Sequence, residues 1–147
     1  MISDALRQRL DVLSAIADES YAASLRIPIR AESRGNARWH WGTSAAHSKA
    51  HRQAAHLVCA RLKPSLRRWV AEGELAVRVI RIAPGRGLDP HDNLGASLKP
   101  IIDGVADAMG LRDDADERVH FIPDAERGGV REFAVELEFY PLHRRSP

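Results

Sequence analysis

The chain of 147 residues has the length of a single domain, and its composition excludes several classes of protein. Hydrophobic residues make up 44% of the chain and charged residues 29%, which is too apolar for a wholly disordered protein. The most apolar uncharged stretch, residues 54–60, is far shorter than the roughly 18 residues that a membrane helix needs. The first residues carry charges where a secretion signal has an apolar run, and Cys59 is the only cysteine. We therefore expect a cytoplasmic protein with no membrane partner and no internal disulfide.

The formal net charge is only +2, but the charges are unevenly distributed along the chain. Ten Lys and Arg residues stand against one acid between residues 26 and 70, whereas six acids stand against one Arg between residues 103 and 117. The basic half favours a polyanionic partner. The acidic cluster favours a bound cation, because carboxylates about 5 Å apart repel each other by roughly 3 kcal/mol at an effective dielectric of about 20. Together they indicate an anionic substrate and a metal ion.

Hydrophobic periodicity predicts three helices and four strands. In chain order these are a helix over residues 2–17, a strand over 23–30, a helix over 44–62, a strand over 74–83, a helix ending near Met109, and strands over 118–122 and 131–140. A basic and aromatic loop over 32–42 precedes the second helix. Lys63-Pro64 ends or bends that helix, and residues 65–71 are expected to add a further turn. This order predicts an α+β fold, a small mixed β-sheet packed with helices on one face.

The third helix has a charged side and an apolar side. On a helical wheel, Asp92, Lys99 and Asp103 lie within about 60° of one another. The opposite side carries Leu94, Leu98, Ile101, Val105 and Met109. Since a helix interior tolerates proline poorly, Pro100 leaves two possibilities: the helix starts upstream, or it starts near Lys99 after a separate turn at 92–97. Lys99 and Asp103 are four residues apart and pair in either case.

Carboxylates also gather in two turns at the ends of this helix. Asp89 and Asp92 follow the strand that ends at residue 83, and Asp113 and Asp114 follow the helix. If the chain packs back across the sheet, the second pair returns toward the first. Oxygen ligands on turns, without a cysteine or a set of histidines, favour Mg²⁺ or Mn²⁺ over zinc. We therefore expect a divalent cation where the two turns meet.

These residues form an ordered pattern that resembles a known nuclease family. The run Asp89…Asp92-Asn93-Leu94…Lys99…Asp103-Gly104…Asp113-Asp114 resembles the RusA family of Holliday junction resolvases. The family signature is D-x-D-N-L, a lysine shortly after, an aspartate four residues beyond that lysine, and then an Asp-Asp pair. The resemblance covers about residues 25–140. It divides the chain into an N-terminal helical extension, residues 1–20, and a RusA-like endonuclease domain, residues 21–147.

The resemblance implies a homodimeric, Mg²⁺-dependent crossover junction endodeoxyribonuclease that also works with Mn²⁺. Such an enzyme resolves four-way junctions or other branched DNA by symmetric phosphodiester hydrolysis. It implies that Asp92 and Asp114 are metal ligands and catalytic residues, and that Lys99 stabilises transition-state charge or orients the nucleophile. The supporting residues would be Asn93, Asp103 and Asp113. The phosphate contacts would come from Arg30, Arg34, Arg38, Lys49 and Arg52 of the basic half.

The sequence departs from the family pattern at two places. The family's first aspartate stands two residues before the second, where this chain has Pro90, so that Asp89 or His91 would fill the first ligand position. The gap from Asn93 to Lys99 is longer than in the shortest family members. The competing hypothesis is therefore a non-catalytic protein that binds branched or single-stranded DNA through a degenerate active site. A metal nuclease acting on RNA or on flaps is a more distant alternative.

Single features also have simpler explanations. Acidic turns that flank a helix are commonly solvated caps. Lys99 and Asp103 are also compatible with an ordinary surface pair worth a few tenths of a kcal/mol. His47 and His51 have the spacing of zinc ligands on a helix, but the chain has no matching pair of cysteines.

Overall fold

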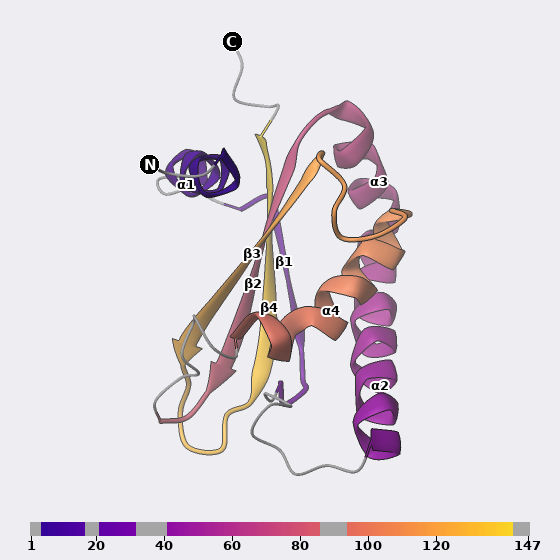
Figure 1. The fold of residues 1–147 in the computed structure, drawn as a ribbon, viewed down its shortest axis with the longest axis vertical. Helices are drawn as coiled ribbons and strands as arrows, with labels where there is room; N and C mark the ends of the chain where they lie inside the picture. Colours follow the sequence, from indigo (N-terminus) through magenta and orange to yellow (C-terminus); the bar gives the residue numbers. More distant parts are fainter. Residues whose placement is uncertain (1–3, 17–20, 32–40, 86–93, 143–147) are drawn as a thin grey trace.

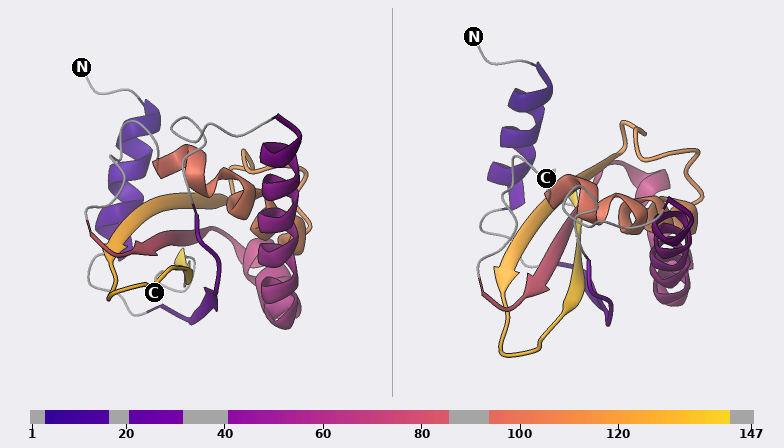
Figure 2. Two further views of the ribbon diagram at one scale, coloured as in Figure 1. Left: turned by 90° about the horizontal axis from the view of Figure 1, so that it is seen from below. Right: turned by 60° about the horizontal axis from the view of Figure 1, so that its bottom comes forward.

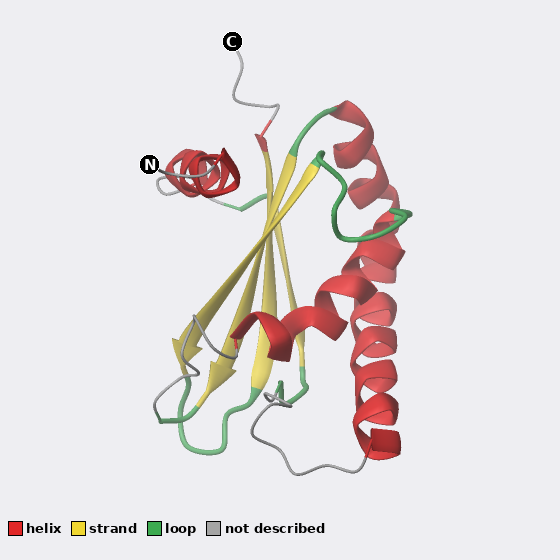
Figure 3. Cartoon of the chain, in the orientation of Figure 1, coloured by secondary structure: helices red, strands yellow, loops and turns green. Residues whose placement is uncertain are grey.

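The computed structural model describes residues 4–16, 21–31, 41–85 and 94–142. Figure 3 distinguishes the helices and strands of these ranges by colour. In chain order they are α1 (Asp4–Ile16), β1 (Ala23–Ile27), α2 (Trp41–Cys59), the 3₁₀ helix η1 (Ala60–Leu62), α3 (Lys63–Glu72), β2 (Leu75–Ala83), α4 (Leu94–Met109), β3 (Val119–Arg127) and β4 (Ala134–Pro141). No helix in these ranges has the length and apolarity to cross a membrane. The prediction of an α+β fold with a mixed sheet is confirmed.

The strands form one sheet in the order β1-β4-β2-β3. β4 is antiparallel to both β1 and β2, whereas β2 and β3 are parallel. The connections from β1 to β2 and from β2 to β3 step across the sheet in the same direction. Since such crossovers are right-handed, both carry their helices over the same face. Figure 1 shows the result, with α2, α3 and α4 together on one side of the strands.

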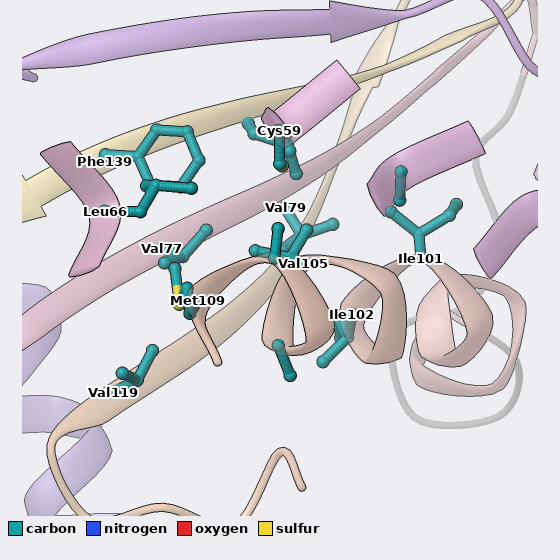
Figure 4. Close-up of a cluster of buried hydrophobic side chains, with 14 of the residues drawn as sticks. Cys59, Leu66, Val77, Val79, Ile101, Ile102, Val105, Met109, Val119 and Phe139 are labelled. Carbon is teal, nitrogen blue, oxygen red and sulfur yellow. The ribbon is translucent and has the colours of Figure 1, made fainter. Parts of the chain in front are cut away.

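The main hydrophobic core lies between these three helices and the sheet. Leu75, Val77 and Val79 alternate along the central strand β2 and are fully buried in this core. The predicted apolar side of α4 supplies Leu94, Leu98, Ile101, Val105 and Met109, all of them buried. Figure 4 shows side chains of β2 and α4 gathered in this cluster. This packing turns the other side of α4, which carries Lys99, toward solvent.

The helix α1 lies on the opposite face of the sheet, which corrects the prediction that the helices share one face. Val12 and Ile16 of α1 pack against Ala76, Ile122 and Tyr140. These strand residues alternate with those of the main core and therefore point to the other side of the sheet. Figures 1 and 2 show the strands between α1 and α2. A helical pattern shows which side of a helix is apolar, but not which face of a sheet that side will cover.

The same face of the sheet also carries ion pairs around two arginines, Arg26 of β1 and Arg78 of β2. The N–O distances range from 2.6 to 3.2 Å. The carboxylates are Asp124, Glu126 and Glu138 around Arg78, and Glu132 and Glu136 around Arg26. Five carboxylates thus surround two guanidinium groups, and we name this surface the acidic face.

Two prolines explain where the helices differ from the predicted boundaries. Pro64 lies in the first turn of α3, where a backbone N–H would have no acceptor within the helix, so the proline costs no hydrogen bond. α3 is 10 residues long, whereas the sequence predicted a single further turn. Pro100 lies inside α4, which is continuous from Leu94. The absent N–H would have bonded to the carbonyl of Ala96, an exposed residue whose carbonyl can bond to water instead. Lys99 therefore belongs to one unbroken helix.

The last two strands also have boundaries that differ from the prediction. β3 continues to Arg127, beyond the predicted end at residue 122, although it contains Pro123. As an edge strand it pairs only with β2, so the N–H that proline lacks is not required. β4 begins at Ala134 and not at Arg131, because Arg131 has a φ of 58°, a left-handed turn conformation.

The helices α2 and α4 touch at Gly104. A Cβ atom on Gly104 would collide with the carbonyl oxygen of Arg52 and would lie 2.8 Å from the Cβ atom of Ala55. The absence of a side chain therefore allows the two helix backbones to approach closely. Gly104 thereby sets the separation of α2 and α4.

We expect Gly104→Ala to lower the free energy of unfolding by about 1–3 kcal/mol, because the added methyl group has no room and the helices must separate. Gly95→Ala in the same helix is the matched control. An added Cβ atom there meets nothing within 4 Å, and alanine favours a helix over glycine by up to about 1 kcal/mol. Urea denaturation measures both changes. A Gly104→Ala variant as stable as the wild type would contradict the close helix contact.

Candidate functional site

Lys99 lies on the exposed side of α4 and contacts two carboxylates. Its Nζ atom is 3.1 Å from Oδ1 of Asp103, one helical turn further on, and 2.5 Å from Oδ2 of Asp114. Lys99 and Asp103 thus form the predicted pair. Asp114 belongs to the turn after α4, so this second contact is not a consequence of helical spacing. We name these three residues the Lys99 cluster.

The cluster contains one cation and two anions. The hydrogen bond to Asp114 is the largest cause of a raised pKa for Lys99; burial opposes it, and the hydrogen bond to Asp103 adds to it. Lys99 therefore stays protonated at neutral pH. The side chain remains 51% exposed, so its ammonium group is accessible to a ligand. The surplus of negative charge suits a nearby cation.

The turn between α4 and β3 brings Asp114 back to the helix. Gly110 follows the last residue of α4 with a φ of 76°, a conformation that ends helices. Asp113 and Asp116 each accept a hydrogen bond of 2.9 Å from the backbone N–H two residues ahead. Such bonds are typical of turns built on aspartate. Asp113 therefore shapes the turn that presents Asp114.

A groove lies between α2 and α4, beside the Lys99 cluster. It has a volume of about 420 Å³, and its walls include Lys49 and Arg52 of α2 with Lys99 and Asp103 of α4. Two residues predicted to bind phosphate thus line the same groove as two residues of the predicted site. We name it the α2–α4 groove.

Arg52 is held in the wall of this groove by Asp107 of α4. Its Nε and Nη2 atoms donate to the two carboxylate oxygens of Asp107 at 2.7 and 2.8 Å. The hydrogen bonds from Arg52 keep the pKa of Asp107 below its ordinary value, so Asp107 stays ionised. Asp107 uses two of the five guanidinium N–H donors, which leaves three for a ligand. The pair therefore fixes Arg52 without blocking it.

The other predicted site residues fall into two groups. Arg30 does not line the groove; its Cζ atom lies 4.3 Å from the ring centroid of Phe133, a cation–π contact. The remaining ones lie outside the described residues and are Arg34, Arg38, Asp89, His91, Asp92 and Asn93. The meeting of the two acidic turns at one cation therefore stays a prediction.

The described ranges contain no group of three or more His, Cys, Asp or Glu side chains arranged to hold a metal. Asp103 and Asp114 supply two carboxylates, and both contact Lys99. A site with three carboxylates therefore requires a ligand from outside the described residues, where the predicted ligands Asp89 and Asp92 lie. His47 and His51 have ring centroids 4.0 Å apart on α2, but no third zinc ligand joins them in the described part of the chain.

Asp107 is a residue of this site that the sequence motif does not identify. It is separated from Arg52 by 55 positions, and no local spacing connects the two. The available signal was that Asp107 follows Asp103 by four residues and so continues the charged side of α4.

Comparisons with known proteins show only a partial similarity. No family model matches the sequence. The chain is 36% identical over 78 residues to an uncharacterized protein of Xylella fastidiosa (strain Temecula1 / ATCC 700964). This match covers 53% of the chain and spans about half of that protein, 51% of its length. The similarity carries no information on activity.

Asp116 stabilises the turn that presents Asp114, and this stabilisation should depend on pH. Hydrogen bonds from the side chain and backbone of Arg118 lower the pKa of Asp116 to about 2. The pKa of an unfolded aspartate is about 3.9, so this stabilisation is present above about pH 4 and is lost as the pH falls through about 2. We expect Asp116→Asn to lower the free energy of unfolding by about 0.5 kcal/mol near pH 7, since solvent screens the pair. Urea denaturation near pH 7 and pH 2 measures the difference, which should become much smaller at the lower pH. A difference that is independent of pH would contradict this role.

Proposed function

We propose that this protein is a magnesium-dependent endonuclease of the RusA type that cuts four-way junctions or other branched DNA. The Lys99 cluster is the observation that carries the proposal. Lys99 and Asp114 are 15 positions apart, yet they meet with Asp103 on one side of α4. An ordinary solvated helix would explain the pair of Lys99 with Asp103, which are four residues apart. It would not explain why the turn after α4 brings Asp114 back to Lys99. The α2–α4 groove adds cationic side chains next to the cluster.

The position of Asp114 along α4 supports a shared metal site. Lys99 is five residues from Leu94, the first residue of α4, which corresponds to an axial rise of about 7.5 Å. The carboxylate of Asp114 therefore lies toward the end of α4 that follows Asp89 and Asp92 in the chain. We propose that these two residues complete the ligand set with Asp114.

The chemistry would be phosphodiester hydrolysis. Bound Mg²⁺ would lower the pKa of a water molecule and neutralise charge on the scissile phosphate. The ammonium group of Lys99 has three N–H donors, of which two are directed to Asp103 and Asp114. The third donor would bond to a phosphate oxygen whose negative charge grows in the transition state. The two carboxylates would hold the ammonium group in position for this bond.

Lys49 and Arg52 would hold the phosphate backbone in the α2–α4 groove. Contacts to phosphates position a nucleic acid without reading its base sequence, as an enzyme that recognises branched structure requires. The proposal includes a homodimer in the cytoplasm, because two equivalent sites related by a twofold axis would cut the two strands symmetrically.

We expect Asp114→Asn and Lys99→Met each to reduce junction cleavage by at least about 100-fold, since each removes a charge that acts on the transition state. Asp92→Asn should have the same effect. All three variants should still bind the junction. The measurements are cleavage of a labelled four-way junction in Mg²⁺ and the affinity for that junction in EDTA.

Glu72→Gln is the control for these variants. Glu72 is 3.9 Å from Arg68 on α3, in a surface ion pair outside the Lys99 cluster, and its loss should leave cleavage unchanged. Full cleavage by Asp114→Asn would refute its role as a metal ligand. A wild-type protein that binds junctions in a salt-sensitive way but cuts nothing in Mg²⁺ or Mn²⁺ would favour the non-catalytic alternative.

Magnesium should also stabilise the fold, because it relieves the repulsion of carboxylates that are clustered only in the folded state. At ten times its Kd the ion adds about 1.4 kcal/mol, which corresponds to a rise in Tm of about 3–6 °C. Asp114→Asn should remove most of this rise. Thermal melting with millimolar Mg²⁺, against sodium at equal ionic strength, measures it. An unchanged wild-type Tm would argue against a formed metal site.

A further inference from the structure

We infer that a second phosphate-binding subsite lies on α2 next to the α2–α4 groove and holds a neighbouring phosphodiester of the same DNA strand. The inference rests on the proposed function, since it supplies the path by which the strand reaches Lys99. It adds Gln53 and His56 to the residues that contact nucleic acid.

The subsite is a separate hollow that adjoins the groove. It has a volume of about 250 Å³ and shares two wall residues, Lys49 and Arg52, with the groove. Its other lining residues are Gln53, His56 and Asp107. The two hollows therefore lie next to each other along α2, between Lys99 and His56.

The lining residues of α2 recur every three or four positions and form one stripe along the helix. From Lys49 to His56 the stripe covers seven residue steps, an axial rise of about 10.5 Å. Neighbouring phosphates of one DNA strand are further apart along the backbone than their rise of about 3.4 Å along the duplex axis. The stripe is therefore long enough to contact two neighbouring phosphates, of which the one nearer Lys99 would be cut.

The donors in this hollow suit an anion. Lys49 carries a positive charge, Arg52 keeps three N–H donors that Asp107 does not use, and Gln53 offers an amide NH₂ group. Both oxygens of the Asp107 carboxylate accept bonds from Arg52, so its negative charge is already paired. The residues of α2 thus contribute donors, and the one carboxylate of the hollow, Asp107 of α4, is paired with Arg52.

The hollow is also held in a fixed shape. Gly104 brings the backbones of α2 and α4 together beside Arg52, and the Arg52–Asp107 pair joins the same two helices. The guanidinium group of Arg52 is therefore held in position before a strand arrives, which reduces the entropy lost on binding.

The test places one charge inside the hollow and the same charge on the same helix outside it. Gln53→Glu and Gln53→Lys alter an exposed residue of the lining, and Ala50→Glu and Ala50→Lys alter an exposed residue that lines neither hollow. The affinity of each full-length variant for a fluorescent four-way junction is measured in EDTA over a range of salt concentrations. Because the two charges have opposite expected effects, a loss of folding cannot imitate the result.

We expect Gln53→Glu to weaken binding by about 3- to 10-fold at low salt and to reduce the slope of log affinity against log salt by about one, since the added negative charge offsets one of the cations that neutralise phosphate. Gln53→Lys should tighten binding and steepen the slope by about one. The two Ala50 variants should leave the slope unchanged. Equal effects at both positions, or none at Gln53, would overturn the subsite.

This result is independent of cleavage. If the wild type cuts no junction in Mg²⁺ but the Gln53 and Ala50 variants differ as expected, the proposed nuclease fails and the subsite stands. If the wild type cuts junctions and the variants do not differ, the subsite fails and the nuclease stands. A wild type that shows no salt-dependent binding to DNA would overturn both.

Discussion

The close contact of α2 with α4 at Gly104 is the constraint on which the rest of the arrangement depends. α4 is buried against the sheet along Leu98 and Val105, and α2 covers a second side at Gly104. Only one side of α4 is left for solvent, and that side carries Lys99 and Asp103. The groove and the orientation of the Lys99 cluster are thus consequences of core packing. A larger residue at position 104 would push against the backbone of Arg52 and so alter the site, although Gly104 does not itself line the groove.

The second requirement is the path of the chain after α4. The turn runs back along the helix, so that Asp114 meets a lysine ten residues before Met109, the last residue of α4. Ten residues correspond to about 15 Å of helix. Asp113 and Asp116 hold this path by bonding to the backbone of the turn itself. The aspartates of this turn therefore have two different roles, which the sequence alone does not distinguish. Two of them shape the turn, and a third is presented to Lys99.

The sequence predicted those features that depend on local spacing. The period of the apolar residues identified the buried side of α4, and the four-residue spacing identified the pair of Lys99 with Asp103. It did not predict the features that depend on the choice of partner. The prediction that all helices lie on one face of the sheet was wrong for α1, because periodicity does not select a face. The Arg52–Asp107 pair joins two helices across 55 positions and has no local signature. The metal ligands at 89–92 remain predictions.

The acidic face gives the molecule an electrical polarity. Its five carboxylates outnumber two arginines on one side of the sheet, while α2, η1 and α3 on the other side carry six Lys and Arg residues against one acid, Glu72. In the field of a polyanion such a dipole experiences a torque before any contact is made. On the function proposed above, the protein would approach DNA already rotated, with the helical side leading, so that a larger share of diffusional encounters begins in a productive orientation. Added salt shortens the range of this torque and should slow association before it weakens the bound complex.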